Sequence, residues 1–81
     1  MISWDVFRAY SLEKKIDTLY NHGNFIVSIR YYGYKVNLYQ LHEDFIEVFI
    51  NHKYSEIERI EKLDIQHSRM KFYCDQIKLC L

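Results

Sequence analysis

The sequence is poor in the residues that break or cross-link a polypeptide chain. Its 81 residues include no proline, two glycines and two cysteines. Long flexible linkers and low-complexity segments are therefore not expected. Two cysteines are also too few for the disulfide framework of a small secreted domain, so we expect Cys74 and Cys80 to be reduced thiols.

An excess of one charge and long apolar runs are missing as well. Eleven basic residues balance eleven acidic ones, whereas dedicated nucleic-acid-binding domains usually carry a basic excess because they neutralise phosphates. No apolar run approaches the roughly 20 residues of a membrane-spanning helix. The N-terminal stretch MISWDVFRAYSLEKK lacks the basic start and apolar core of a signal peptide. We expect a cytoplasmic protein with no membrane partner.

Apolar and aromatic residues are abundant instead. The chain is 49% hydrophobic and 17% aromatic, which exceeds the content of a disordered segment and indicates a packed fold. We expect residues 1–81 to form a single α+β domain. In this fold an N-terminal helix packs on a three-stranded antiparallel meander, and a C-terminal helix follows.

The N-terminal helix is predicted from about Trp4 to His22, with Ser3 as its cap and Gly23 closing its end in a left-handed conformation. Helical periodicity assigns to its core face Val6, Ala9, Leu12, Ile16, Leu19 and Tyr20. A second, aromatic stripe on the first turns contains Trp4, Phe7 and Tyr10.

Three segments then alternate with period two: Asn24–Tyr32, Lys35–Leu41 and Phe45–Asn51. The turns between them are predicted at Gly33-Tyr34 and at His42-Glu43-Asp44. Pairing Tyr32 with Lys35 and Leu41 with Phe45 collects the aliphatic side chains on one face: Phe25, Val27, Ile29, Tyr31, Val36, Leu38, Ile46, Val48 and Ile50.

The opposite face of this predicted meander is too apolar to be fully solvated. It holds Ile26, Ser28, Arg30, Tyr32, Lys35, Asn37, Tyr39, Leu41, Phe45, Glu47 and Phe49. We expect part of it to be covered by the C-terminal segment, by a second copy of the chain or by a different protein.

Two interpretations stay open for Glu56–Asp64. Ser55 and Glu58 fit a helix capping box, but the preceding polar residues could equally turn the chain into a fourth strand. The last segment is predicted as a helix from about His67 to Lys78, because its apolar residues follow helical spacing at Met70, Tyr73, Cys74 and Ile77.

No pattern of reactive residues indicates catalysis or metal binding. The four histidines and two cysteines show no zinc-site spacing such as CxxC, and neither cysteine has an activating motif. The only glycines, Gly23 and Gly33, form no phosphate-binding loop. We therefore expect no catalytic residue, no metal, no cofactor and no enzymatic activity.

Aromatic surfaces without an obvious internal partner favour a binding function, since Tyr, Trp, Phe and Arg are enriched at interfaces. The candidate partner-binding residues are Trp4, Phe7, Tyr10, Arg30, Tyr32, Lys35, Tyr39, Phe45 and Phe49. The expected partner is a host protein, with a ribonucleoprotein nuclease, RNA itself and a second copy of the chain as open alternatives.

Three stretches carry a resemblance: NFIVSIRYYGYKVNLYQL, EDFIEVFINHK and SRMKFYCDQIKL. Their wealth of residues with AT-rich codons is similar to that of small proteins from AT-rich bacteria, their phages and mobile elements. In size and aromatic surface the chain also resembles anti-CRISPR proteins, including those directed at RNA-targeting, type VI effectors. The resemblance implies stoichiometric, non-enzymatic inhibition of a host nuclease or its guide-RNA complex.

An RNA-binding module is the alternative. The predicted order of helix, three strands and helix resembles the double-stranded-RNA-binding domain, which implies contacts with duplex RNA. That family has a longer loop between its first two strands and a lysine-rich start to its last helix, and this chain has neither. On the outer sheet face, Arg30, Tyr32, Lys35 and Tyr39 could stack on bases and contact phosphates.

Overall fold

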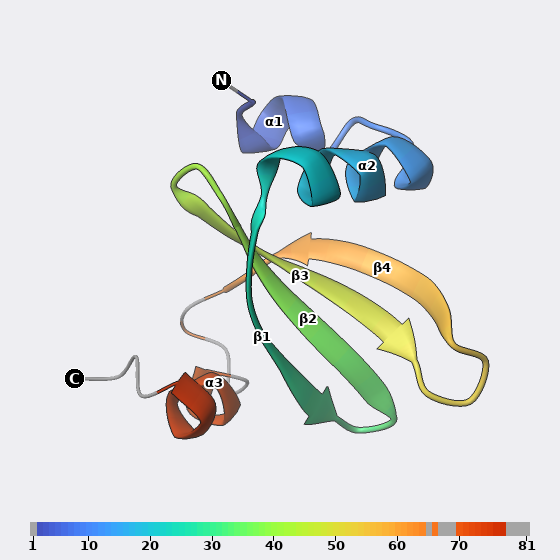
Figure 1. The fold of residues 1–81 in the computed structure, drawn as a ribbon, viewed down its shortest axis with the longest axis vertical. Coiled ribbons are helices and arrows are strands. Elements are labelled where there is room, and N and C mark those ends of the chain that lie inside the picture. Colours follow the sequence, from blue (N-terminus) through green and yellow to red (C-terminus); the bar gives the residue numbers. More distant parts are fainter. Residues whose placement is uncertain (1, 65, 67–69, 78–81) are drawn as a thin grey trace.

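A computed structural model describes residues 2–64, 66 and 70–77. It confirms the α+β class and shows a four-stranded antiparallel sheet in the order β1-β2-β3-β4, with helices before and after it (Figure 1). The elements are α1 (Trp4–Phe7), α2 (Leu12–His22), β1 (Asn24–Tyr31), β2 (Tyr34–Leu41), β3 (Asp44–Asn51), β4 (Glu56–Lys62) and α3 (Met70–Ile77).

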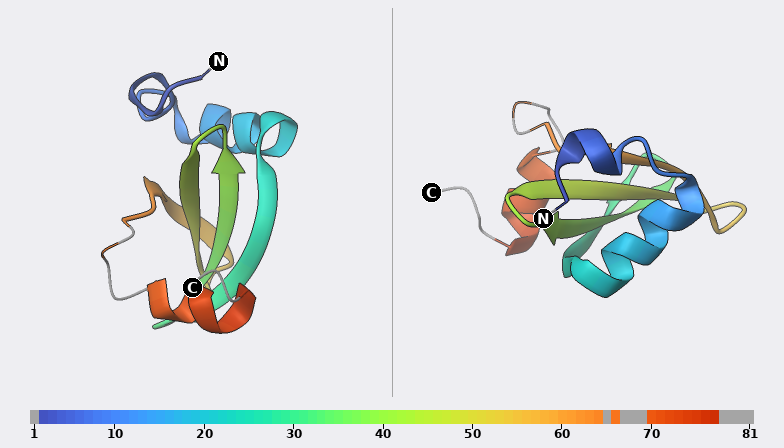
Figure 2. Two further views of the ribbon diagram at one scale, coloured as in Figure 1. Left: turned by 90° about the vertical axis from the view of Figure 1, so that its left-hand side faces the viewer. Right: turned by 90° about the horizontal axis from the view of Figure 1, so that it is seen from above.

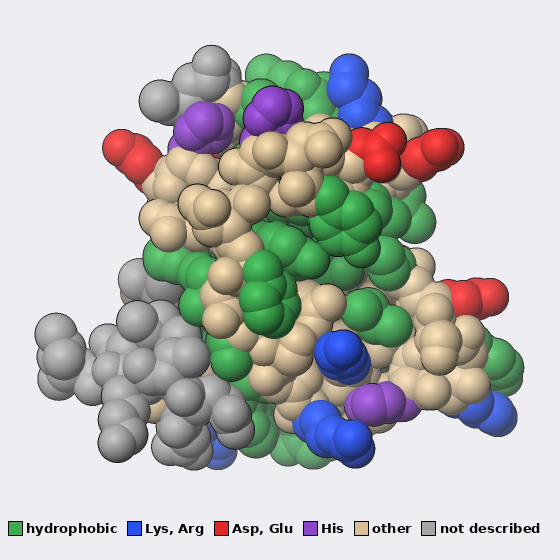
Figure 3. All heavy atoms as spheres, viewed as in Figure 1, with side chains coloured by type: hydrophobic (Ala, Val, Ile, Leu, Met, Phe, Trp, Pro, Cys, Tyr) green, Lys and Arg blue, Asp and Glu red, His purple; other side chains and the backbone are tan. Residues whose placement is uncertain are grey.

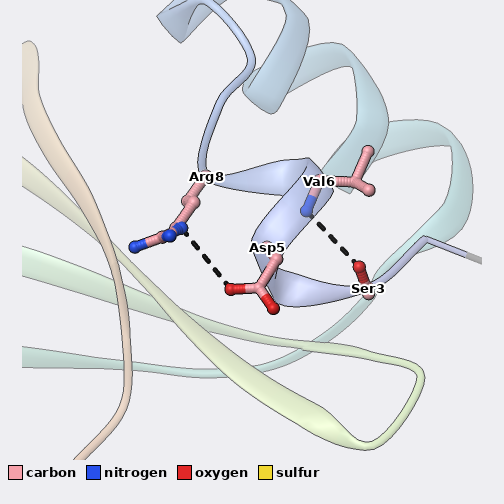
Figure 4. Close-up of polar contacts among 4 residues, drawn as sticks. All are labelled: Ser3, Asp5, Val6 and Arg8. Carbon is pink, nitrogen blue, oxygen red and sulfur yellow. Dashed lines mark hydrogen bonds and ion pairs between the residues drawn. The ribbon is translucent and has the colours of Figure 1, made fainter.

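The N-terminal region forms two helices, so the prediction of one continuous helix is wrong. The Ser3 side chain accepts a hydrogen bond from the Val6 N–H at 3.4 Å and caps α1, beside an Asp5–Arg8 ion pair (Figure 4). The Ser11 side chain accepts a hydrogen bond from the Lys14 N–H at 3.2 Å and caps α2. A serine at either position satisfies a backbone donor that helix geometry leaves unpaired, so the chain can start a second helix at residue 12.

The break between α1 and α2 changes which side chains reach the core. Phe7 and Leu19 are buried, whereas Val6, Leu12 and Tyr20 are exposed by 49%, 44% and 66%. The predicted core face of the helix is therefore wrong except for Leu19 and the half-buried Ile16. A single straight helix could not aim both Phe7 and Leu19 at the sheet in this way.

Gly23 ends α2 in an extended conformation, with φ −88° and ψ 159°, and not in the predicted left-handed one. A glycine is needed there because of a close approach. A Cβ atom on residue 23 would lie 2.7 Å from the carbonyl oxygen of Leu19. The chain therefore passes directly from the last turn of α2 into β1.

The first hairpin pairs the predicted strands but turns one residue earlier, which shifts the pairing of the two strands by two residues. Tyr31 pairs with Tyr34, and the turn is Tyr32-Gly33, with positive φ angles of 44° and 83°. Positive φ at both positions is typical of the type I′ turn that closes two-residue hairpins. Because side chains alternate with period two, this shift of two residues leaves the predicted faces of β1 and β2 largely unchanged.

The second hairpin differs from the prediction by one residue, which reverses the faces of β3. Leu41 pairs with Asp44 across a two-residue turn in which His42 has φ 57°. Val36 and Leu38 therefore lie opposite Phe49 and Glu47. The aliphatic residues that were predicted to join them, Ile46, Val48 and Ile50, lie on the other face of the sheet.

Helices cover both faces of the sheet (Figure 2). On what we call the α1/α2 face, the buried core contains Phe7, Leu19, Tyr39, Leu41, Ile46, Val48 and Ile60. On the α3 face it contains Ile29, Val36, Leu38, Phe49, Leu63 and Tyr73. The C-terminal helix is thus one of the covers that the apolar sheet required.

Residues 56–62 form the fourth strand, which decides between the two interpretations of this segment. The pairing of β3 with β4 shifts between Phe49 and Ile50, because Glu58 is an extra residue in β4. Arg59 lies opposite Phe49, and its guanidinium carbon is 4.0 Å from the centre of that ring. The charge therefore stays half-exposed while the side chain covers an aromatic residue.

A buried polar pair joins α3 to the sheet. The Tyr73 hydroxyl donates a hydrogen bond of 2.8 Å to the Glu47 carboxylate, and both residues are fully buried.

Two predictions for the C-terminal segment have different outcomes. The predicted helix ends at His67 and Lys78 lie outside the described residues. Cys74 is disulfide-bonded, so the expectation of a reduced thiol is wrong for this residue; the chain's other cysteine lies outside the described residues.

Candidate interaction surface

The first hairpin places two cations side by side on the α1/α2 face of the sheet. Arg30 in β1 pairs directly with Lys35 in β2, so their β-carbons are roughly 5 Å apart. Both side chains are exposed, and neither belongs to an ion pair among the described residues. Like charges directly opposite each other oppose pairing, so this arrangement stabilises nothing within the domain.

The turn between β3 and β4 lies beside the turn of the first hairpin. The backbone N–H of His52 donates a hydrogen bond of 3.0 Å to the carbonyl oxygen of Gly33. The Asn51 carboxamide oxygen accepts from the backbone N–H groups of Lys53 at 2.8 Å and Tyr54 at 3.3 Å, which holds this turn in place. The Lys53 ammonium lies 5.4 Å from the centre of the Tyr54 ring.

Together the two turns form one surface at this end of the sheet, which we call the basic–aromatic end. Tyr32 and Tyr54 are exposed by 82% and 61%. Figure 3 shows Lys and Arg side chains next to a His side chain at the lower end of the molecule, where Figure 1 places both turns; other His side chains lie at the upper end. The members of this surface are Arg30, Tyr32, Lys35, His52, Lys53 and Tyr54.

A nearby carboxylate, Glu58, already has partners within the domain. Its carboxylate accepts a hydrogen bond of 2.9 Å from the Asn51 carboxamide. Hydrogen bonding to the Tyr34 hydroxyl, followed by that to Asn51, holds the pKa of Glu58 below its ordinary value, and the same contact raises the pKa of Tyr34. Glu58 is therefore engaged with Tyr34 and Asn51 rather than with Arg30 or Lys35.

The predicted aromatic stripe on the N-terminal helix packs against the domain itself. Phe7 is fully buried, and Trp4 and Tyr10 are half-buried against the same core. Their ring centres lie 5.8 Å and 6.1 Å from that of Phe7. Phe7 therefore offers a partner no area in this conformation, and Trp4 and Tyr10 offer only part of their rings.

The predicted sheet aromatics are divided between the two faces. Tyr39 is buried on the α1/α2 face, whereas Phe49 is buried and Phe45 half-buried on the α3 face. The one-residue difference in the second hairpin causes this division. Of the nine residues proposed as a partner surface, the structure brings together as exposed neighbours only Arg30, Tyr32 and Lys35.

Sequence reasoning missed three exposed aromatic residues. Tyr54 was treated only as part of a turn, Tyr20 was assigned to the helix core, and Phe25 to the aliphatic face of the sheet. Phe25 is 56% exposed, and its ring centre lies 5.6 Å from that of Tyr39 on the α1/α2 face. A bulge at Ile26 reverses the alternation of β1 there, and no signal in the sequence marks this bulge.

The described part of the chain lacks two other features that would suggest a function. No group of three or more His, Cys, Asp or Glu side chains there is arranged to hold a metal ion. Among the same residues, no helix is both long and apolar enough to cross a membrane. The basic–aromatic end is therefore the surface on which we base a functional proposal.

Comparisons with known proteins add no relative. No protein-family model matches the chain, and neither a curated protein nor a solved structure does.

Proposed function

We propose that this protein acts by stoichiometric binding of a macromolecular partner through its basic–aromatic end. The observation that carries the proposal is the directly opposed pair Arg30 and Lys35, beside the exposed Tyr32. This pairing is unfavourable for the isolated sheet, and a partner that supplies negative charge would relieve it. Exposed tyrosines next to cations are also typical of interface hot spots.

The partner proposed is a host nuclease or its guide-RNA complex, and the protein would be its inhibitor, as in anti-CRISPR proteins. A surface of cations and aromatic rings suits this partner class, since such complexes present phosphates and acidic protein surface close together. Trp4 and Tyr10 could extend the contact only by their exposed parts. No catalytic step by this chain is required.

A titration distinguishes stoichiometric binding from catalysis. Purified protein is added to a type VI effector loaded with guide RNA, and target-triggered RNA cleavage is measured. Inhibition should be complete near equimolar protein and should not deepen with time. Inhibition by a small fraction of an equivalent, progressing with time, would instead show turnover by this chain and contradict the proposal.

Matched variants locate the surface. Lys35→Glu combined with Tyr32→Ala removes a cation and a ring from the basic–aromatic end, so inhibition and capture of the effector should fall at least tenfold, since hot-spot residues contribute about 2 kcal/mol or more. The control is Lys14→Glu, the same charge change on an exposed residue of α2. Equal activity of the two variants would place the binding surface elsewhere.

Direct RNA binding is the second candidate, and the same opposed cations favour it. Arg30 and Lys35 could contact successive phosphates while Tyr32 stacks on a base. Affinity for a fluorescent single-stranded RNA should then fall with salt, by a logarithmic slope of roughly 0.7 for each phosphate contacted. Lys35→Glu should reduce that slope. An RNA affinity that is undetectable at low salt would exclude this function.

A further inference from the structure

The two outer strands of the sheet differ in how they are protected against pairing with another strand. In β4, five of seven residues are charged: Glu56, Glu58, Arg59, Glu61 and Lys62. In β1, only Arg30 among eight residues is charged. Charged side chains on an edge strand are a common defence against edge-to-edge association, and β1 lacks this defence.

The edge of β1 is also uncovered among the described residues. The left view of Figure 2 shows β1 at the margin of the sheet, with α2 above it, α3 below it and no element outside it. The two residues that close a two-residue hairpin exchange backbone hydrogen bonds with each other. Along each strand, residues then alternate between those whose N–H and C=O groups point to the partner strand and those whose groups point away from it. Tyr31 therefore bonds to β2, while Ser28 and Arg30 turn their backbone N–H and C=O groups outward.

We propose that β1 pairs antiparallel with β1 of a second copy of this chain, about a two-fold axis at Ser28. The bulge at Ile26 supports this register. It places Phe25 on the same face as Ser28 and Arg30, although the spacing of residues 25 and 30 would otherwise separate them. Symmetric pairing at Ser28 then sets Val27 opposite Ile29 of the second copy, and Phe25 opposite Arg30.

The ends of β1 are complementary in chemistry, which is why a second copy fits. At the start of the strand, Phe25 and Tyr20 both contact Tyr39, with ring centres 5.6 Å and 6.3 Å away, and both are more than half exposed. At the other end lie Arg30 and Lys35. An antiparallel two-fold arrangement brings the aromatic end of one copy against the cationic end of the other, which allows cation–π contacts twice.

The same operation on β4 would be unfavourable. A two-fold pairing of β4 with β4 of a second copy would place the three glutamates and two cations of one strand beside the same residues of the other. The bulge at Glu58 would also interrupt the pairing of the two strands. The only charge of β1, in contrast, never meets its own copy in the register centred on Ser28. The contrast between the edges therefore selects β1, and the resulting assembly is a continuous eight-stranded sheet.

The association is tested by sedimentation velocity between about 1 µM and 1 mM, a range that covers weak and moderate dimers. The mass should rise from 10.0 kDa towards twice that value with concentration. Hydrogen exchange at the Ser28 and Arg30 amides should slow in parallel. A monomer at every concentration overturns the proposal and leaves β1 open to an extended segment of a different protein.

Two matched substitutions at one exposed position test the register. Phe25→Lys sets a cation against Arg30 of the second copy twice, whereas Phe25→Glu sets an anion there, and both lose the same ring. The dimer of Phe25→Lys should be about tenfold weaker than that of Phe25→Glu. A like-charge cross-strand pair opposes pairing whereas an opposite-charge pair favours it, and the two-fold dimer contains this pair twice. Adding Arg30→Glu to Phe25→Lys should restore association to the level of Phe25→Glu.

Control variants separate local from general charge effects. Leu12→Lys and Leu12→Glu introduce the same two charges on an exposed residue of α2 that belongs to neither proposed surface, and they should leave dimerisation unchanged. Circular dichroism checks that each variant is folded. Equal dimer affinities for Phe25→Lys and Phe25→Glu would contradict the register centred on Ser28. Both proposals use Arg30, but none of these measurements includes the proposed nuclease partner, so failure of dimerisation and failure of partner binding are distinguishable.

Discussion

The two faces of the sheet are covered in different ways. On the α1/α2 face, a four-residue helix inserts Phe7 and an eleven-residue helix inserts Leu19 among apolar side chains. The buried Thr18 hydroxyl donates within α2, to the Lys14 carbonyl oxygen, and so does not link the helix to the sheet. On the α3 face, one short helix inserts Tyr73, whose hydroxyl donates to the buried carboxylate of Glu47. The first face relies on apolar burial, and the second adds a buried hydrogen bond.

This difference affects how precisely each helix is placed. Apolar contacts are non-directional, so small displacements on the α1/α2 face change the free energy gradually. A buried carboxylate is costly unless its hydrogen bonds are made, so α3 has to dock with the Tyr73 hydroxyl at Glu47. We therefore expect large truncations to matter most on the α1/α2 face and single-atom changes to matter most on the α3 face.

The largest effect is expected for Phe7→Ala, because it empties the centre of the α1/α2 face. Truncation of a buried phenylalanine lowers the free energy of unfolding by about 3–5 kcal/mol, a large share of what a domain of this size has. Urea denaturation measures the change. The control is Val6→Ala at the neighbouring, 49% exposed position, where the loss should stay within about 0.5–1 kcal/mol. Similar losses for both variants would contradict the burial of Phe7.

The next effect is expected for Tyr73→Phe, which deletes one oxygen atom on the α3 face. Glu47 then loses a buried donor, and the free energy of unfolding should fall by about 1–3 kcal/mol. Hydrogen exchange should show the loss first in α3. Tyr54→Phe, the same change on a 61% exposed residue, should leave stability within about 0.5 kcal/mol. If the two variants were equally stable, the Tyr73–Glu47 hydrogen bond would contribute nothing.

A smaller effect is expected for Ser11→Ala on the α1/α2 face. The substitution removes the cap of α2 and should cost about 1 kcal/mol in thermal or urea unfolding. Ser3→Ala is the matched control, since Ser3 caps the four-residue α1 through a longer contact of 3.4 Å. A larger loss for Ser3→Ala would indicate that α1, and not α2, determines the order of this region.

The smallest effect concerns the rim of the α3 face, where Tyr34 holds the pKa of Glu58 below its ordinary value. A carboxyl group with a lowered pKa in the folded state stabilises the fold above its unfolded pKa, and this contribution is lost as pH falls through the folded pKa. Tyr34→Phe should raise the titration midpoint of the Glu58 carboxyl group measured by NMR. The free energy of unfolding should then fall slightly less as the pH is lowered than it does in the unmodified protein. Tyr32→Phe should leave that midpoint unchanged; a rise in both variants would contradict the assignment.

Much of the fold and part of the site could be predicted because the signals are local. Strand alternation predicts β1, β2 and β3, and the first hairpin keeps Arg30, Tyr32 and Lys35 on one surface even though its turn was misplaced. The contribution of the β3–β4 turn was missed, because Lys53 and Tyr54 join this surface only through the pairing of β2 with β3.

The faces of β3 could not be predicted, because its sequence FIEVFIN is apolar on both sides. Phe49 and Val48 are both buried, the first under α3 and the second on the α1/α2 face. With helices on both faces, either assignment of the strand buries large side chains, so alternation alone could not choose. The choice depends on a two-residue turn with positive φ at His42.

The amino-acid sequence by itself determined the α+β class, the order of the first three strands and the exposed cations of the first hairpin, because these follow from periodicity over a few neighbouring residues. Only the tertiary structure decided that Phe7 and Phe49 are core residues, that a bulge turns Phe25 outward and that Glu47 is buried beneath Tyr73. These outcomes depend on contacts between residues far apart in the chain, whose packing energies no local pattern contains.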